Sequence, residues 1–330
     1  MDKIKIDSTL QNKAKQKKSI FHSSSSVFLC ILNPDFGIDT EISLLNHFIL
    51  KRDIRDVEAT FEIRDLSGDI VKSFRISMDK ECAYAVKLSD YLKISFIGSV
   101  YVFFKSSKNL AVPFCAVMSV IKATNSVCGV HTYGRRLEEE ELKTGIDLQR
   151  TIETGWTARD SRNVKSFAAL HGGRFELQLK IKIECSNYLG KVININTLKN
   201  LLPFATLLII PQDLHPEIVE HLDGNKGHFK IYIDGLNGVF PRMICGNFAS
   251  NSSSLELKNA QEVQFTHTNF DFSTIEQPDS IGKLGYFNQP SLPSGYGLIY
   301  PVNTDKKIKI DNKNYSSGSI HQIYIDPISQ

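Results

Sequence analysis

The chain has 330 residues, of which 42% are hydrophobic, 23% are charged and 10% are aromatic. This is the composition of a globular protein that buries a sizeable core, and it excludes a low-complexity, collagen-like or wholly disordered chain. Lys and Arg number 39 against 36 for Asp and Glu, a formal charge of +3. That balance argues against nucleic acid or an anionic membrane surface as the main partner.

The N-terminus is rich in lysine, with six lysines among the first eighteen residues. We interpret residues 1–19 as a basic flexible tail, with a tether to an acidic surface as the alternative. The longest apolar runs, 27–32 and 201–210, are too short for a membrane-spanning helix, and no secretory signal pattern is present. The sequence therefore predicts no membrane span and a cytoplasmic location.

The chain has six cysteines, and no two of them have the CxxC spacing of a zinc knuckle or a thioredoxin-like centre. Most lie in apolar stretches, where a cysteine behaves as a small buried hydrophobic residue. We expect free thiols in a reducing cytoplasm, although the even number also allows disulfides. The six are Cys30, Cys82, Cys115, Cys128, Cys185 and Cys245.

Apolar and polar residues alternate with a period of two through much of the chain, which indicates β-strands rich in β-branched and aromatic residues. The clearest strand pair is 59–64 and 70–76, joined by the turn residues 65–69. Further strands are predicted at 100–104, 116–121, 175–183 and 229–233. Helices are few, and the sequence favours them only at 136–150 and 214–222.

The two halves of the chain resemble each other at four places in the same order. Residues 98–113 and 227–241 each contain a strand, a polar turn with Asn and an apolar-Pro pair. A cysteine-bearing strand follows each of them, and then a His-Thr pair at His131 or His267. Upstream, a short sequence match aligns His22 with His171. Chance similarity between amphipathic strands is the alternative, but four ordered matches favour a duplication.

The predicted fold class is all-β, with two duplicated antiparallel β-sandwich domains and a short helical connection. The first domain covers residues 20–135, the connection 136–164 and the second domain, with a C-terminal extension, 165–330. The last 55 residues are rich in turns and end in strands at 306–310 and 320–325. We expect these strands to complete or cover the second sheet.

Two His-Thr pairs are the first candidate site. The sequence has no P-loop, GxGxxG, HExxH, GxSxG or EF-hand pattern, which disfavours common nucleotide-dependent chemistry. His131 and His267, at the ends of equivalent strands, could ligate one divalent metal or shuttle a proton. In an extended strand, Asn269 and Asp271 would share the face of His267, and Arg135 follows His131. The alternative is that each imidazole caps its sandwich through a hydrogen bond to a neighbouring carbonyl.

The second candidate is the segment 153–161 of the predicted connection, which holds the only tryptophan, Trp156. Connections on a rigid scaffold often carry function. An indole ring against a sugar, with Glu153, Arg159 and Asp160 binding hydroxyl groups, would form a carbohydrate platform. Alternatively, Trp156 fills the gap between the domains and Arg159 pairs with Asp160.

These observations lead to two hypotheses of different classes. The first is a non-enzymatic binding or assembly protein that uses the inter-domain cleft for a small molecule or glycan, and that could form an oligomer; it rests partly on what sandwiches commonly do. The second is a metal-assisted or His-dependent enzyme built on the two His-Thr pairs. The sequence specifies no cofactor beyond a divalent metal in the second case, and it does not identify the ligand.

Overall fold

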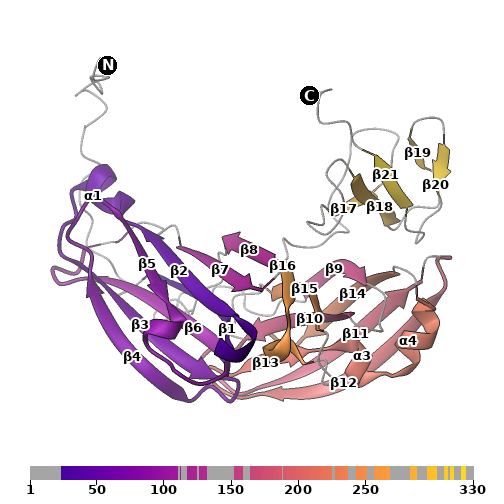
Figure 1. Cartoon of the computed structure of the whole chain (residues 1–330), viewed down its shortest axis with the longest axis horizontal. Helices are drawn as coiled ribbons and strands as arrows, with labels where there is room; N and C mark the ends of the chain where they lie inside the picture. The colour runs from indigo at the N-terminus through magenta and orange to yellow at the C-terminus, as the bar shows by residue number, and fades with distance from the viewer. Residues whose placement is uncertain are drawn as a thin grey trace.

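The protein is described from a computed structural model, which consists of antiparallel sheets with few helices (Figure 1). The all-β expectation is therefore confirmed. No helix among the described residues is both long and apolar enough to cross a bilayer. The described residues are 24–110, 112, 117–124, 126–131, 152–158, 164–187, 189–224, 227–236, 243–250, 256–267, 283–287, 296–302, 308–310, 313–315 and 321–324.

The first unit, indigo to magenta in Figure 1, has two four-stranded antiparallel sheets in the orders β1-β6-β3-β4 and β5-β2-β7-β8. Buried residues alternate with half-buried ones along most of β3, as its sequence predicts. The strands are β1 (Ser24–Leu32), β2 (Asp39–Leu45), β3 (Val57–Asp65), β4 (Ile70–Ser77), β5 (Ala83–Lys87), β6 (Phe96–Ser106), β7 (Val117–Ala123) and β8 (Ser126–His131). Three short helices lie between them: η1 (Pro34–Phe36), α1 (His47–Arg52) and η2 (Leu88–Asp90).

The second unit has the sheets β12-β11-β14-β9 and β13-β10-β15-β16. Its strands are β9 (Ile152–Ala158), β10 (Val164–His171), β11 (Leu177–Ser186), β12 (Val192–Leu201), β13 (Thr206–Ile209), β14 (Gly227–Asp234), β15 (Met243–Ala249) and β16 (Glu262–His267). The helices α3 (Pro211–Leu214) and α4 (Glu217–Leu222) fall in and beside the predicted helical segment 214–222, and η3 (Leu257–Asn259) precedes β16. The helix predicted at 136–150 lies outside the described residues.

The two units have the same strand order. Adding eight to each strand number of the first unit gives β9-β14-β11-β12 and β13-β10-β15-β16, which are the two sheets of the second unit. The matched segments 98–113 and 227–241 contain most of β6 and all of its counterpart β14, and His131 and His267 end the equivalent strands β8 and β16. A shared order is what a duplication requires, but it does not by itself establish a common origin.

The upstream histidine match does not fit this equivalence. His171 ends β10, whose counterpart is β2, and pairing registers place His171 at the position of Leu45. His22 precedes β1 and lies outside the described residues. Sequence similarity over four residues was too short to separate one strand end from another.

One hairpin turn occurs at the same place in both units. Between β3 and β4, the amide of Gly68 donates to the Asp65 carbonyl (3.1 Å), and the amide of Asp69 donates to the Asp65 carboxylate (3.0 Å). Between β11 and β12, Gly190 and Lys191 make the corresponding bonds to Asn187 (2.9 and 3.0 Å). Both glycines have positive φ, 97° and 79°, which is why the turn places glycine there. The sequence analysis identified only the first turn.

The hydrophobic core does not stop at the boundary between the units. In β10, Phe167 and Ala169 belong to the core cluster of the first unit, whereas Ala168 and Leu170 belong to that of the second. Successive residues of a strand point to opposite faces, so the sheet β13-β10-β15-β16 is buried on both sides. This explains the uninterrupted apolar stretch at 167–170. The two units are therefore joined by a shared core.

Two parts of the chain differ from their expected arrangement. Strand β9 lies in the segment expected to connect the domains, yet it pairs with β14 in the second unit. The described C-terminal strands pair with one another, so they do not complete a sheet of the second unit, and that they cover it stays a prediction: β17 (Lys283–Phe287), β18 (Tyr296–Val302) and β21 (His321–Tyr324) form one sheet, and β19 (Ile308–Ile310) and β20 (Lys313–Tyr315) form a hairpin. Strand pairing is a long-range choice that alternation alone does not specify.

Candidate functional site

The β3–β4 turn of the first unit docks on the second unit. Its Leu66 carbonyl accepts a hydrogen bond from the Thr206 amide (3.0 Å). The guanidinium of Arg64 is buried there, donates to the Gly68 carbonyl (2.7 Å) and lies 4.4 Å from the centre of the Phe204 ring. The Glu62 carboxylate balances its charge, at 2.6 Å. These contacts fix how the two units meet on this side.

A buried tyrosine and a buried histidine continue this contact. The Tyr101 hydroxyl donates to the Gly172 carbonyl (2.8 Å), across the boundary between the units. Next to Gly172, His171 Nδ1 lies 2.9 Å from the Thr206 hydroxyl, while its buried Nε2 has no hydrogen-bond partner. Burial lowers the pKa of His171 from 6.5 to about 3, because the charged imidazolium would lose its hydration. The histidine is therefore neutral at physiological pH.

A groove of about 510 Å³ lies beside this junction. Its apolar lining includes Ile97 of β6, from the first unit, and Leu208 of β13 from the second. The Asn33 amide of the first unit donates to the Lys258 carbonyl (2.6 Å), which holds the η3 segment at the groove. The full lining is Ile97, Lys165, Leu208, Ile210, Asp213, Glu256, Leu257 and Lys258.

The polar residues of the groove form two ion pairs. Lys165 of β10 pairs with Asp213 of α3, and Lys258 pairs with Glu256 at 2.9 Å. Each pair brings one ammonium and one carboxylate, so the charges of the groove compensate. Since three of these side chains are about half exposed, the pairs stabilise the fold little, and the charged groups lie at the surface of the groove.

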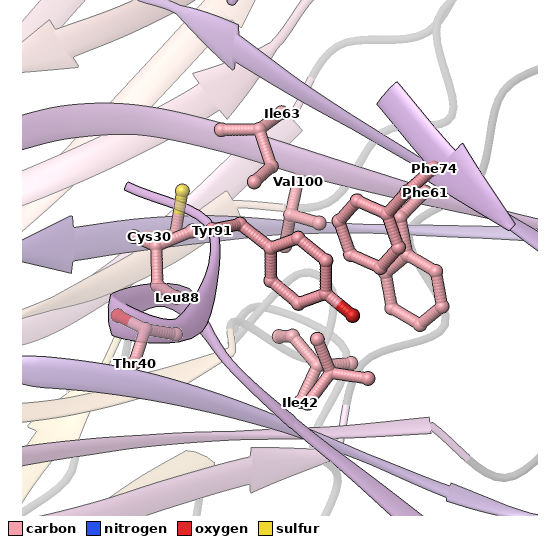
Figure 2. A pocket seen from close by; sticks show the side chains of 10 residues that line it. Cys30, Thr40, Ile42, Phe61, Ile63, Phe74, Leu88, Tyr91 and Val100 are labelled. Atoms are coloured by element: carbon pink, nitrogen blue, oxygen red, sulfur yellow. The ribbon is translucent and has the colours of Figure 1, made fainter. Parts of the chain in front are cut away.

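A second hollow lies inside the first sandwich (Figure 2). Its volume is about 10 Å³, room for one water molecule at most, and its walls are almost entirely apolar. The rings of Phe61, Phe74 and Tyr91 stack in series beside it, with centroids 4.8 and 3.6 Å apart. Cys30 also lines it, and burial raises the pKa of that thiol. This hollow is a packing defect and offers no room for a ligand.

The predicted metal ligands lie on two strands that are close in space. Strands β8 and β16 contact each other, and the Ser126 hydroxyl bridges the Val263 amide (2.9 Å) and carbonyl (3.2 Å). In the sheet registers His131 is opposite Met118, and His267 is opposite Ile244. Among the described residues, no cluster of three or more His, Cys, Asp and Glu side chains could hold a metal. The metal hypothesis therefore stays a prediction.

The predicted carbohydrate platform is only partly described. Glu153 and Trp156 lie in β9, opposite Tyr232 and Phe229 of β14. Trp156 is therefore a strand residue, although the sequence analysis placed it in a connection. Arg159, Asp160, Arg135, Asn269 and Asp271 lie outside the described residues. The five described cysteines are free, and Cys115 lies outside the described residues.

Sequence reasoning missed every residue that lines the groove. Lys165, Asp213 and Lys258 come from three separate elements and belong to no motif. The one available signal was Pro211, which begins α3 and so predicts a helix start that carries Asp213 in its first turn. No sequence pattern would have placed that turn opposite β6.

Comparisons with known proteins add no relatives: no protein-family model matches the chain, and no curated protein is significantly similar to it.

Proposed function

We propose that this chain is a non-enzymatic binding protein that takes a small, neutral, hydroxyl-rich ligand, with a mono- or disaccharide as the expected class, in the groove beside the junction. The proposal rests on one observation: the groove combines an apolar floor with two compensated ion pairs. Its volume lies within the roughly 300–1,000 Å³ typical of ligand sites.

The chemistry of the lining favours a polyol over a charged ligand. A sugar hydroxyl can donate to the carboxylates of Asp213 and Glu256 and accept from the ammonium groups of Lys165 and Lys258. The C–H face of the ring would lie on Leu208 and Ile210. A formally charged ligand would have to compete with one of the existing ion pairs.

Titration calorimetry with a panel of neutral mono- and disaccharides, together with a hexuronic acid and an amino sugar, tests this proposal. We expect binding of at least one neutral sugar, and a loss of affinity of about tenfold or more in Asp213→Gln and Glu256→Gln, because each loses a charged acceptor. Glu58→Gln, an exposed ion-paired carboxylate on β3, is the matched control and should bind normally.

Two outcomes would contradict the proposal. The first is that neither the neutral nor the charged sugars bind. The second is that a sugar binds equally well to the parent and to both groove variants. In the second case the ligand site lies elsewhere, and the β9 segment with Glu153 and Trp156 is then the place to examine.

Two finer proposals accompany this function. We infer that the units are a tandem duplication, which the common strand order and the two matching turns support. We also infer a reducing, cytoplasmic environment, because Cys30 and Cys245 are free and lie in the cores of the two units. Burial raises the pKa of both thiols, as it raises that of Cys185 to about 12.

A further inference from the structure

Strand β12 is a long sheet edge with few of the features that usually block edge pairing, and Lys199 near its end is its only charged residue. It pairs with β11 over ten consecutive positions with no bulge, and no other described strand pairs with it. The edge strands β5 and β13 are short, with five and four residues. Strands β8 and β16 cover one another. Proteins normally protect a free edge by shortening, bulging, charging or covering it.

The side chains of β12 are unusual for an exposed edge. Residues 192–198 carry no charge, and their outward positions read Val192, Asn194, Asn196 and Leu198. The two apolar residues of this outward row are 47% and 75% exposed. Leu189, in the turn before the strand, and Leu202, just after it, are also exposed. Such a row of apolar and amide side chains indicates a surface that is covered in the functional state.

We propose that β12 pairs with β12 of a second copy of this chain, antiparallel and centred on Ile195. In that register Val192 faces Leu198 of the partner subunit, and Asn194 faces Asn196 of the partner subunit. The exposed apolar residues are then buried against each other, and the amides can bond as pairs. On the inner face, Ile193 meets Thr197 of the partner subunit and Ile195 meets its own copy.

The sequence of the strand itself is the argument for a second copy as the occupant. A two-fold axis pairs the strand with a second copy that runs in the opposite direction, so each residue must be compatible with the residue opposite it. Residues 192–198 meet this condition at every position. In this register Lys191 is opposite Lys199 of the partner subunit, immediately outside the seven paired residues, so like charges meet once at each end of the pairing and none meet within it. The pairing would join two four-stranded sheets into one of eight strands.

Sedimentation velocity over a wide range of concentration is the first test, with a matched pair of variants. We expect a dimer whose dissociation constant rises about 100-fold in Val192→Lys, because each of two symmetric contacts then buries a lysine. Ile70→Lys is the control: Ile70 holds the equivalent position on β4, is 52% exposed and should leave the dimer unchanged. A parent that stays monomeric, or a dimer that Val192→Lys does not weaken, overturns the proposal.

Mixed-subunit crosslinking tests the register. In a Cys82→Ser background, which removes the one fully exposed thiol among the described cysteines, oxidation of a mixture of Val192→Cys and Leu198→Cys chains should give disulfide-linked dimers. Each variant alone should not crosslink, because like positions lie six residues apart along the paired strands. Crosslinking of either variant alone, or none in the mixture, overturns the proposed register.

Discussion

Strands β4 and β12 hold the same position in their units but present different edges. From the registers, Ile70 corresponds to Val192, and Phe74 corresponds to Ile195. A register shift next to Arg64 gives β4 one extra residue, and Lys72 and Arg75 stand where β12 has Ile193 and Asn196. A bulge and charges are two standard protections of an edge. One strand order thus supports an edge protected by a bulge and charges and an edge with a single lysine, Lys199.

The turns before these strands differ in the same way. Both use an Asp or Asn acceptor and a glycine with positive φ. The first turn, however, is pressed against the second unit: a Cβ added at Gly68 would lie 2.5 Å from the Pro203 carbonyl oxygen. The second turn carries the exposed Leu189. Both units have the same local turn chemistry. The residues that pack against each turn determine whether it forms a contact between the units.

The largest expected effect concerns the two turn glycines. Gly68→Ala should lower the free energy of unfolding by about 3 kcal/mol or more, because backbone strain is added to a clash with backbone atoms of the second unit. Gly190→Ala shares the strain, but its turn contacts helix α4 through the Asn187 and His221 side chains and not the backbone of the other unit through Gly190, and it should cost about 1 kcal/mol. Urea denaturation of both variants measures the difference. Equal losses would show that the first turn is not tightly docked.

The charged partner of that turn comes next. Arg64→Met should cost about 2–3 kcal/mol, since it leaves the Gly68 carbonyl and the Glu62 carboxylate without their donor. Lys182→Met is the matched control, because Glu184 corresponds to Glu62 and Lys182 pairs with it near the surface. That change should cost less than about 0.5 kcal/mol. Urea denaturation of both variants measures these losses of stability. A loss in Lys182→Met as large as that in Arg64→Met would contradict the prediction.

Apart from the control variants, the smallest predicted effect depends on pH. His171 is buried where its counterpart Leu45 is 50% exposed. Its pKa is lowered to about 3, so below pH 6.5 the unfolded chain binds a proton that the folded chain excludes. The free energy of unfolding should therefore fall by about 2 kcal/mol between about pH 7 and pH 5 through this residue. In His171→Asn, which has no titrating group, that part of the decrease should disappear; an unchanged pH dependence would refute a neutral, buried His171.

Local patterns were sufficient for much of the fold. Alternation at 59–64 and 70–76 and the turn between them predicted the β3–β4 hairpin, and the match of 98–113 with 227–241 identified β6 and β14 as equivalent strands. These features depend on side chains close together in sequence. Strand β9 was missed as a strand because residues 152–158 show little alternation of apolar and polar residues.

The candidate site could not be predicted in the same way. Lys165 and Asp213 are 48 residues apart, and Asn33 reaches Lys258 across 225 residues. The histidines and Trp156 drew attention because they are rare and chemically versatile, which is a property of residue type and carries no information about neighbours. The residue types that line the groove are common on any protein surface. They can be recognised as a candidate site only once the structure shows that they lie together where the two units meet.

By itself, the sequence determined that the chain is all-β and where several strands of the two units lie, and it matched the segments that contain β6 and β14. Those properties follow from the period-two pattern and from turn chemistry, which act over a few residues. The tertiary structure alone decided that one sheet is buried on both faces, that the Gly68 turn docks on the other unit while the Gly190 turn contacts helix α4 of its own unit, and that β12 is left as an open edge. Each of these depends on which strands become neighbours, and strand pairing is set by contacts between residues that are distant in the chain.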